Sequence, residues 1–149
     1  MNFQVATRKH PSPSESANRR KRSAQVALRP ALVVMSQDQS ILAIAANAGS
    51  DQWRVESRVP AIDNRELLAL QNVRIVIFDD ELVEPSDHGW MLAQIRRCAP
   101  QAAIIYVAGN HNWDTERQAR TGGAQYYCSK PIDYTIFREV LKSFLRVAR

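Results

Sequence analysis

The sequence lacks any long hydrophobic run. No apolar stretch approaches the ~20 residues that a bilayer-spanning helix needs, and the N-terminal residues lack the apolar core of a signal peptide. The two cysteines, Cys98 and Cys128, have no metal-ligand spacing, and the three histidines, His10, His88 and His111, are scattered. These absences argue against a membrane partner and a histidine-based metal site, and they favour a reducing, cytoplasmic location.

Acidic side chains are scarce in the first 29 residues. That segment holds seven arginines and lysines, including the run 19–22, against a single acid, Glu15. The remaining 120 residues carry 13 basic and 14 acidic side chains, so the formal net charge of +5 comes from the N-terminal end. Its Ser, Pro and charge content predicts a disordered basic tail over residues 1–29, which could contact nucleic acid, followed by one folded domain over residues 30–149.

From residue 30 onward, short apolar runs alternate with stretches of helical periodicity. We expect strands at 31–35, 53–58, 73–80, 102–109 and 124–131, and helices at 38–49, 63–72, 89–99, 112–123 and 134–148. In the last helix, Ile136, Val140, Phe144 and Val147 lie in line. This order predicts an α/β fold, a doubly wound five-stranded parallel sheet with helices on both faces, whose polar site lies beyond the carboxyl ends of the strands.

Two motifs stand at strand ends. They are IVIFDDEL over residues 75–82 and GAQYYCSKPID over residues 123–133. Together with the β-α order, they resemble the receiver domain of bacterial two-component response regulators, over about residues 30–149. The resemblance implies the (βα)5 flavodoxin-like fold of that family.

The resemblance also implies roles for individual residues. Asp79 matches the phosphoacceptor, with Asp80 as runner-up if the strand ends one residue later. Lys130 matches the lysine that pairs with that carboxylate or its phosphoryl group, and Pro131 matches a proline that follows it through a cis peptide bond. Tyr127 matches the aromatic residue that swings between buried and exposed positions.

Other positions depart from the family pattern. The acid pair that ends the first strand falls on Ser36 and Gln37, and the Ser or Thr that ends the fourth strand falls on Ala108. Mg²⁺ prefers carboxylate oxygens, and here Asp38 and Asp79 are its weak candidate ligands. We therefore assign no certain cofactor and expect weak or no Mg²⁺-dependent phosphorylation at Asp79.

The predicted function is that of a stand-alone receiver-like module in phosphorelay signalling, which acts by protein–protein interaction and is not an enzyme. Its expected partners are a histidine kinase or another signalling protein, or a second copy bound through the surface of residues 112–148. Exposed candidates there are Asn112, Arg117, Arg120, Tyr126 and Lys142. One alternative is a nucleic-acid-associated regulator that uses the basic tail. Another is a phosphatase with an aspartate nucleophile, although Glu81 replaces the second aspartate of its Asp-x-Asp motif.

Overall fold

The computed structural model describes residues 9, 10, 12–59 and 71–148, and for residues 24–28 it describes the backbone alone. Most of the helix expected at 63–72 lies outside these residues. Within the described part, no helix is long and apolar enough to cross a bilayer.

Five parallel strands form one sheet in the order β2-β1-β3-β4-β5. The strands are β1 (Ala31–Met35), β2 (Arg54–Ser57), β3 (Val73–Asp79), β4 (Ala103–Ala108) and β5 (Ala124–Ser129). Each lies within two residues of its predicted bounds at either end. The chain runs outward in one direction from β1 to β2 and in the other from β3 to β5, so the topological switch point lies between β1 and β3.

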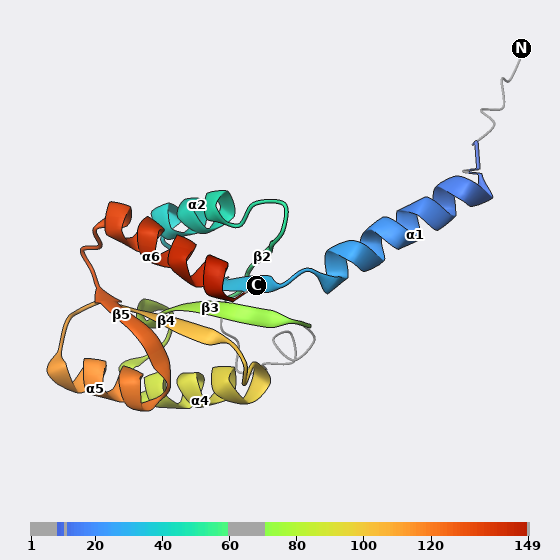
Figure 1. Ribbon diagram of the computed structural model, residues 1–149. Helices are drawn as coiled ribbons and strands as arrows, with labels where there is room; N and C mark the ends of the chain where they lie inside the picture. Colours follow the sequence, from blue (N-terminus) through green and yellow to red (C-terminus); the bar gives the residue numbers. More distant parts are fainter. Residues whose placement is uncertain (1–8, 11, 60–70, 149) are drawn as a thin grey trace, which may run out of the picture.

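Helices cover both faces of this sheet. They are α2 (Gln39–Ala48), α4 (His88–Cys98), α5 (Trp113–Thr121) and α6 (Tyr134–Val147), with short 3₁₀ turns η1 (Asp80–Leu82) and η2 (Pro85–Asp87) after β3. Figure 1 shows α2 and α6 on one face and α4 and α5 on the other. The predicted α/β fold class is confirmed.

The sheet separates two hydrophobic cores, because successive side chains of a strand point to opposite faces. Phe78 and Tyr106 pack toward α4 and α5, against Met91, Leu92 and Ile95. Ile77 and Val107 pack toward α2 and α6, against residues such as Ile41, Phe137 and Leu141. All residues of β1 and β4 are buried, as expected of central parallel strands.

The buried face of α6 differs from the predicted one. The helix buries Phe137, Leu141 and Leu145, whereas Ile136 is 55% exposed and Val147 is 84% exposed. The buried residues pack in the core shared with α2, and the Tyr134 hydroxyl donates to Asp38 Oδ2 at 3.2 Å, at the N-terminus of α2. Periodicity alone could not choose between two neighbouring apolar stripes on the same helix.

The N-terminal segment contains a helix, α1 (Pro13–Leu28), where the sequence analysis predicts disorder. Ser12 and Glu15 form a reciprocal cap: Ser12 N donates to Glu15 Oε2 at 2.9 Å, and Glu15 N donates to Ser12 Oγ at 3.4 Å. Pro13 stands at the first helical position, where its missing N–H costs nothing. The expectation of disorder rested on the Ser, Pro and charge content of the segment and did not take this capping pair into account.

Candidate functional site at the carboxyl ends of the strands

Four of the residues predicted from the sequence to form the site meet at the carboxyl ends of the strands. They are Ser36, Asp79, Ala108 and Lys130. Met35 is paired with Phe78 across β1 and β3, so Ser36 and Asp79 follow side by side. Ala108 is paired with Ser129 across β4 and β5, and Lys130 N donates to Ala108 O at 2.8 Å. The strand register itself therefore places the lysine near the aspartate.

Three donors hold the Asp79 carboxylate, which is 1% exposed. Oδ2 accepts from Ser36 Oγ at 2.7 Å and from Lys130 Nζ at 2.9 Å, while Oδ1 accepts from Glu81 N at 3.2 Å. A buried carboxylate requires such compensation because burial strongly disfavours an unpaired charge. The predicted pairing of Asp79 with Lys130 is present.

Lys130 has a second partner in Glu81, whose Oε2 also lies 2.9 Å from Nζ. Partial burial of the ammonium acts to lower the pKa of Lys130, but hydrogen bonds to Glu81 and Asp79 and their negative charges outweigh it. The pKa of Lys130 is therefore raised above its ordinary value, and the side chain is a permanent cation at neutral pH. Glu81 was not predicted as its partner, although Glu81 and Asp79 are two residues apart at the strand end.

Asp80, the runner-up phosphoacceptor, lies in a different environment. Its side chain turns toward the core beneath α4 and α5, where Oδ2 accepts from the Tyr106 hydroxyl at 2.8 Å. Oδ1 accepts from Gly109 N at 2.8 Å. Burial, followed by the hydrogen bond to Asp80, raises the pKa of Tyr106 above its usual range. Neutral donors thus hold a carboxylate that is only 5% exposed.

His88, at the start of α4, adjoins this carboxylate. Its Nε2 lies 2.8 Å from Asp80 O and 3.1 Å from Val83 O, and it donates because carbonyl oxygens only accept. Nδ1 faces the Tyr106 hydroxyl at 3.4 Å and Asp80 Oδ2 at 3.7 Å. His88 therefore ties the loop after β3 to the core. No local pattern in the sequence groups Asp80, His88 and Tyr106.

The remaining predicted residues surround the site. The peptide bond between Lys130 and Pro131 is cis, as the resemblance implies. Tyr127 is half-buried and stacks on Tyr106 with ring centroids 5.7 Å apart, and its hydroxyl lies 3.2 Å from His111 Nδ1. Gln37 is exposed and has no contact in the site among the described residues.

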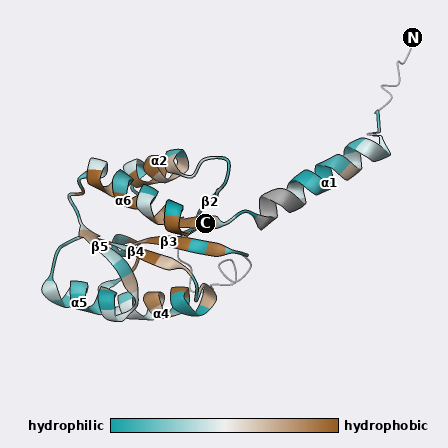
Figure 2. Cartoon of the chain, in the orientation of Figure 1, coloured by the Kyte–Doolittle hydropathy of each residue, from teal (hydrophilic) through white to brown (hydrophobic). Residues whose placement is uncertain are grey.

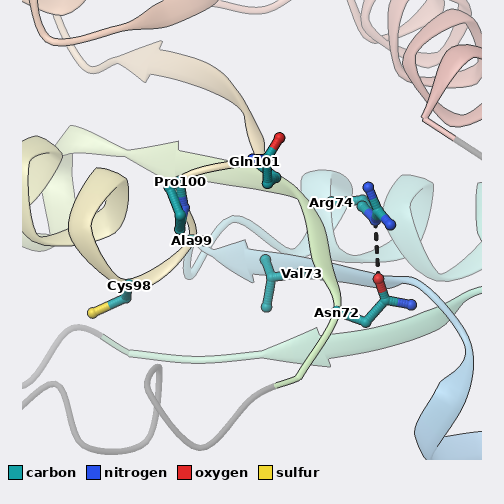
Figure 3. A pocket seen from close by; sticks show the side chains of 7 residues that line it. All are labelled: Asn72, Val73, Arg74, Cys98, Ala99, Pro100 and Gln101. Carbon is teal, nitrogen blue, oxygen red and sulfur yellow. Dashed lines mark hydrogen bonds between the residues drawn. The ribbon is translucent and has the colours of Figure 1, made fainter.

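A shallow pocket lies away from this site, at the opposite end of the strands. Figure 3 shows its lining, which comes from the start of β3 and the turn before β4. The lining residues are Asn72, Val73, Arg74, Cys98, Ala99, Pro100 and Gln101. None of the sequence-predicted site residues is among them, so this pocket is not part of the Asp79 site.

Many solved structures with the same architecture are response-regulator receiver domains. A response regulator from Thermotoga maritima is similar with a TM-score of 0.65 and 18% identity, over 80% of this chain and 99% of that chain. A CheY-like receiver domain protein from Methanospirillum hungatei JF-1 is similar with a TM-score of 0.64 and 17% identity, over 80% of this chain and 96% of that chain. The chain has the receiver fold. A signal receiver domain of an HD domain-containing protein from Pseudomonas fluorescens Pf-5 is similar with a TM-score of 0.64 and 23% identity, over 80% of this chain and 97% of that chain.

These likenesses are ones of fold, since all three identities are low. Neither a protein-family model nor a curated protein matches the sequence. The receiver fold nevertheless fixes which strand ends meet, and it is these strand ends that carry Asp79 and Lys130.

Magnesium is the cofactor that the receiver resemblance implies, and the residues present do not fit it. The Asp38 carboxylate caps α2, accepting from Ser40 N at 2.9 Å and Ile41 N at 3.3 Å. The Ser36 hydroxyl accepts from the backbone N of Asp38 and donates to Asp79 Oδ2, so it occupies one oxygen of the second candidate ligand. In the ranges that the structure describes, no three His, Cys, Asp or Glu side chains are grouped so as to hold a metal ion.

Proposed function

We propose that this chain is a receiver-like signalling module that works by protein–protein interaction, with weak or no Mg²⁺-dependent phosphorylation at Asp79. Its partners would be signalling proteins such as a histidine kinase, or a second copy of the chain. The observation that carries the proposal is the set of donors around Asp79: an ammonium, a hydroxyl and a backbone amide already satisfy its oxygens.

The chemistry of phosphoryl transfer supports this proposal. Attack by a carboxylate brings it against the anionic oxygens of the donor, and a metal ion normally offsets that charge. Ser36 and Gln37 supply dipoles but no negative charge to hold such an ion. Ala108 carries no hydroxyl to bind a phosphoryl group, and its small side chain is fully buried.

The surface of α5, β5 and α6 is the candidate contact face. In the sheet formed by the described residues, β5 is an edge strand, so one side of its backbone has no neighbouring strand there. Trp113 on α5 is 74% exposed, and with Glu116, Arg117 and Arg120 it lines a shallow hollow. Tyr126, one of the predicted exposed residues, is half-buried, whereas Asn112, Arg117, Arg120 and Lys142 are exposed.

The proposal is tested by incubation with acetyl phosphate and Mg²⁺ followed by intact-mass measurement. We expect little or no phosphate adduct on the wild type. A matched variant, Ser36→Asp/Gln37→Asp, restores the missing acids beside Asp79 and is expected to form a Mg²⁺-dependent adduct. Addition of Asp79→Asn to that variant should abolish the adduct, which assigns it to this carboxylate.

The result that would contradict the proposal is full phosphorylation of the wild type. It would have to depend on Mg²⁺ and vanish in Asp79→Asn. In that case the hydroxyl and amide groups near Asp79 would suffice for the metal, and the chain would be a conventional phosphorylated receiver.

A further inference from the structure

Helix α1 carries a concentration of positive charge that the receiver fold does not use. Arg19, Arg20, Lys21 and Arg22 are consecutive, and each is exposed. Among the residues that the structure describes, no ion pair joins any of the four to an acid. The single acid of the segment, Glu15, is engaged in the cap with Ser12.

The geometry of the helix spreads these charges around its axis. Successive helical residues are rotated by about 100°, so four in a row cover about 300°. Figure 1 shows α1 extending away from the sheet and its covering helices. Figure 2 shows hydrophilic residues along the described side chains of α1, in contrast to the hydrophobic strands. The four cations therefore face solvent, where a polyanion can reach them from several sides.

The chemistry of the helix favours nucleic acid over a membrane surface. A helix that lies on a bilayer needs an apolar face opposite its charges. From residue 14 to residue 24, the only apolar side chains are the alanines Ala17 and Ala24. Val26 and Leu28 follow at the C-terminal end of α1. The charged part of the helix can therefore neutralise phosphates but has no apolar face to insert among acyl chains.

Groove dimensions further favour DNA over double-stranded RNA. An α-helix with side chains is about 10–12 Å across, and the major groove of B-DNA is about 12 Å wide. The major groove of A-form RNA is too deep and narrow to admit one. We propose that α1 is a DNA-binding arm, which lies in the major groove of duplex DNA and holds it through phosphate contacts of residues 19–22.

The experiment measures binding of the full chain to a fluorescein-labelled 20-bp DNA duplex by anisotropy over a series of NaCl concentrations. The test variant is Arg19→Gln/Arg20→Gln/Lys21→Gln/Arg22→Gln, since glutamine removes charge but keeps helix propensity. The matched control removes four exposed cations from the body instead: Arg74→Gln/Arg97→Gln/Arg138→Gln/Arg146→Gln. Circular dichroism verifies that both variants keep their helix content.

We expect the test variant to bind at least tenfold more weakly at low salt, while the control variant keeps most of the affinity. Each phosphate contact contributes about −0.9 to the slope of log K against log[salt], so the test variant should lose up to about 3.6 of that slope. An Asp79→Asn variant should bind DNA as the wild type does, because α1 and the Asp79 site are separate. This result separates the arm from the proposed signalling function.

Three results would overturn the proposal. The first is no salt-dependent DNA binding by the wild type. The second is equal loss of binding in the test and control variants, which would place the contacts on the body. The third is a preference for a 20-bp RNA duplex or for phosphatidylserine vesicles over the DNA duplex, which would show that another anionic surface is the partner of α1.

Discussion

Asp79 and Asp80 are adjacent in the chain and both are buried, yet their carboxylates are stabilised by different means. Asp79 has a full positive charge within hydrogen-bond distance, the Lys130 ammonium. Asp80 has the Tyr106 hydroxyl and the Gly109 amide, which are neutral dipoles, with the His88 ring beyond them. β3 ends at Asp79 and η1 begins at Asp80, and the two side chains reach different partners: Asp79 reaches Ser36 and Lys130, and Asp80 reaches Tyr106.

Two neighbouring acids in a sequence therefore need not form one acidic site in the folded protein. Asp79 faces the edge where β1 and β5 end, whereas Asp80 anchors the loop after β3 to the core. A metal ion bound between Asp79 and Asp80 would have to displace the hydroxyl and amide donors that already hydrogen-bond to the Asp80 carboxylate. Asp79 therefore lies at the carboxyl ends of the strands, whereas Asp80 lies in the core beneath α4 and α5.

The largest expected effect is from Lys130→Met. The substitution leaves Asp79 as a buried carboxylate without its cation, which should cost about 3 kcal/mol in the free energy of unfolding, measured by urea denaturation. Glu81→Gln is the control, because the Glu81 side chain is 57% exposed and its removal should cost less than about 1 kcal/mol. Equal losses in the two variants would mean that the buried Lys130–Asp79 pair contributes no more to stability than the exposed contact of Lys130 with Glu81.

Tyr106→Phe tests the Asp80 side of the comparison. The change keeps the ring in the core but removes a donor from a buried carboxylate, so we expect a loss of about 2 kcal/mol. Tyr127→Phe removes a hydroxyl whose partner, His111, is exposed, and it should change stability by no more than about 0.5 kcal/mol. An unaltered unfolding midpoint in Tyr106→Phe would show that Asp80 does not need its hydroxyl donor.

Ser36→Ala should have a smaller effect on the Asp79 side. It removes the 2.7 Å hydrogen bond to Oδ2, but Lys130 still neutralises the carboxylate. We expect a loss of about 1 kcal/mol in the same urea titration. Gln37→Ala, at an exposed neighbouring position, should leave the midpoint in place. A loss in Ser36→Ala as large as that in Lys130→Met would make the hydroxyl, not the ammonium, the main partner of Asp79.

The smallest effect concerns Cys128, which lies on β5 close to Asp79. Burial, and then the negative charge of Asp79, raise the pKa of the Cys128 thiol from its ordinary 9.0 to about 11. Because the thiolate is the reactive form, the iodoacetamide alkylation rate in a Cys98→Ser background should rise with a midpoint near that raised value. Addition of Asp79→Asn should move the midpoint slightly downward. A midpoint at the ordinary value would argue against the burial of Cys128.

The strands and the meeting of Asp79 with Lys130 could be predicted from the sequence because parallel strands end at one edge. The pairing of Asp80 with Tyr106 could not, since it depends on the register between β3 and β4 and on which face each side chain takes. Helix α1 was missed for a different reason. The Ser12–Glu15 capping signal was present in the sequence, but charge and serine content outweighed it in the prediction.

The buried face of α6 illustrates a limit of periodicity. Two neighbouring stripes of apolar residues satisfy the helical repeat, and Phe137 and Leu141 pack in the core while Ile136 stays exposed. The choice depends on packing against residues remote in sequence, such as Ile41 on α2. Such contacts are absent from any local pattern.

We propose that Lys130 and Ser36 satisfy the Asp79 carboxylate without a metal ion. Thermal unfolding in EDTA and in 10 mM Mg²⁺ tests it most directly, because a ligand that binds the folded state raises its stability by mass action. We expect the same melting temperature in both buffers for the wild type and a higher melting temperature with Mg²⁺ in Ser36→Asp/Gln37→Asp. A Mg²⁺-dependent increase in the wild type that disappears in Asp79→Asn would contradict it.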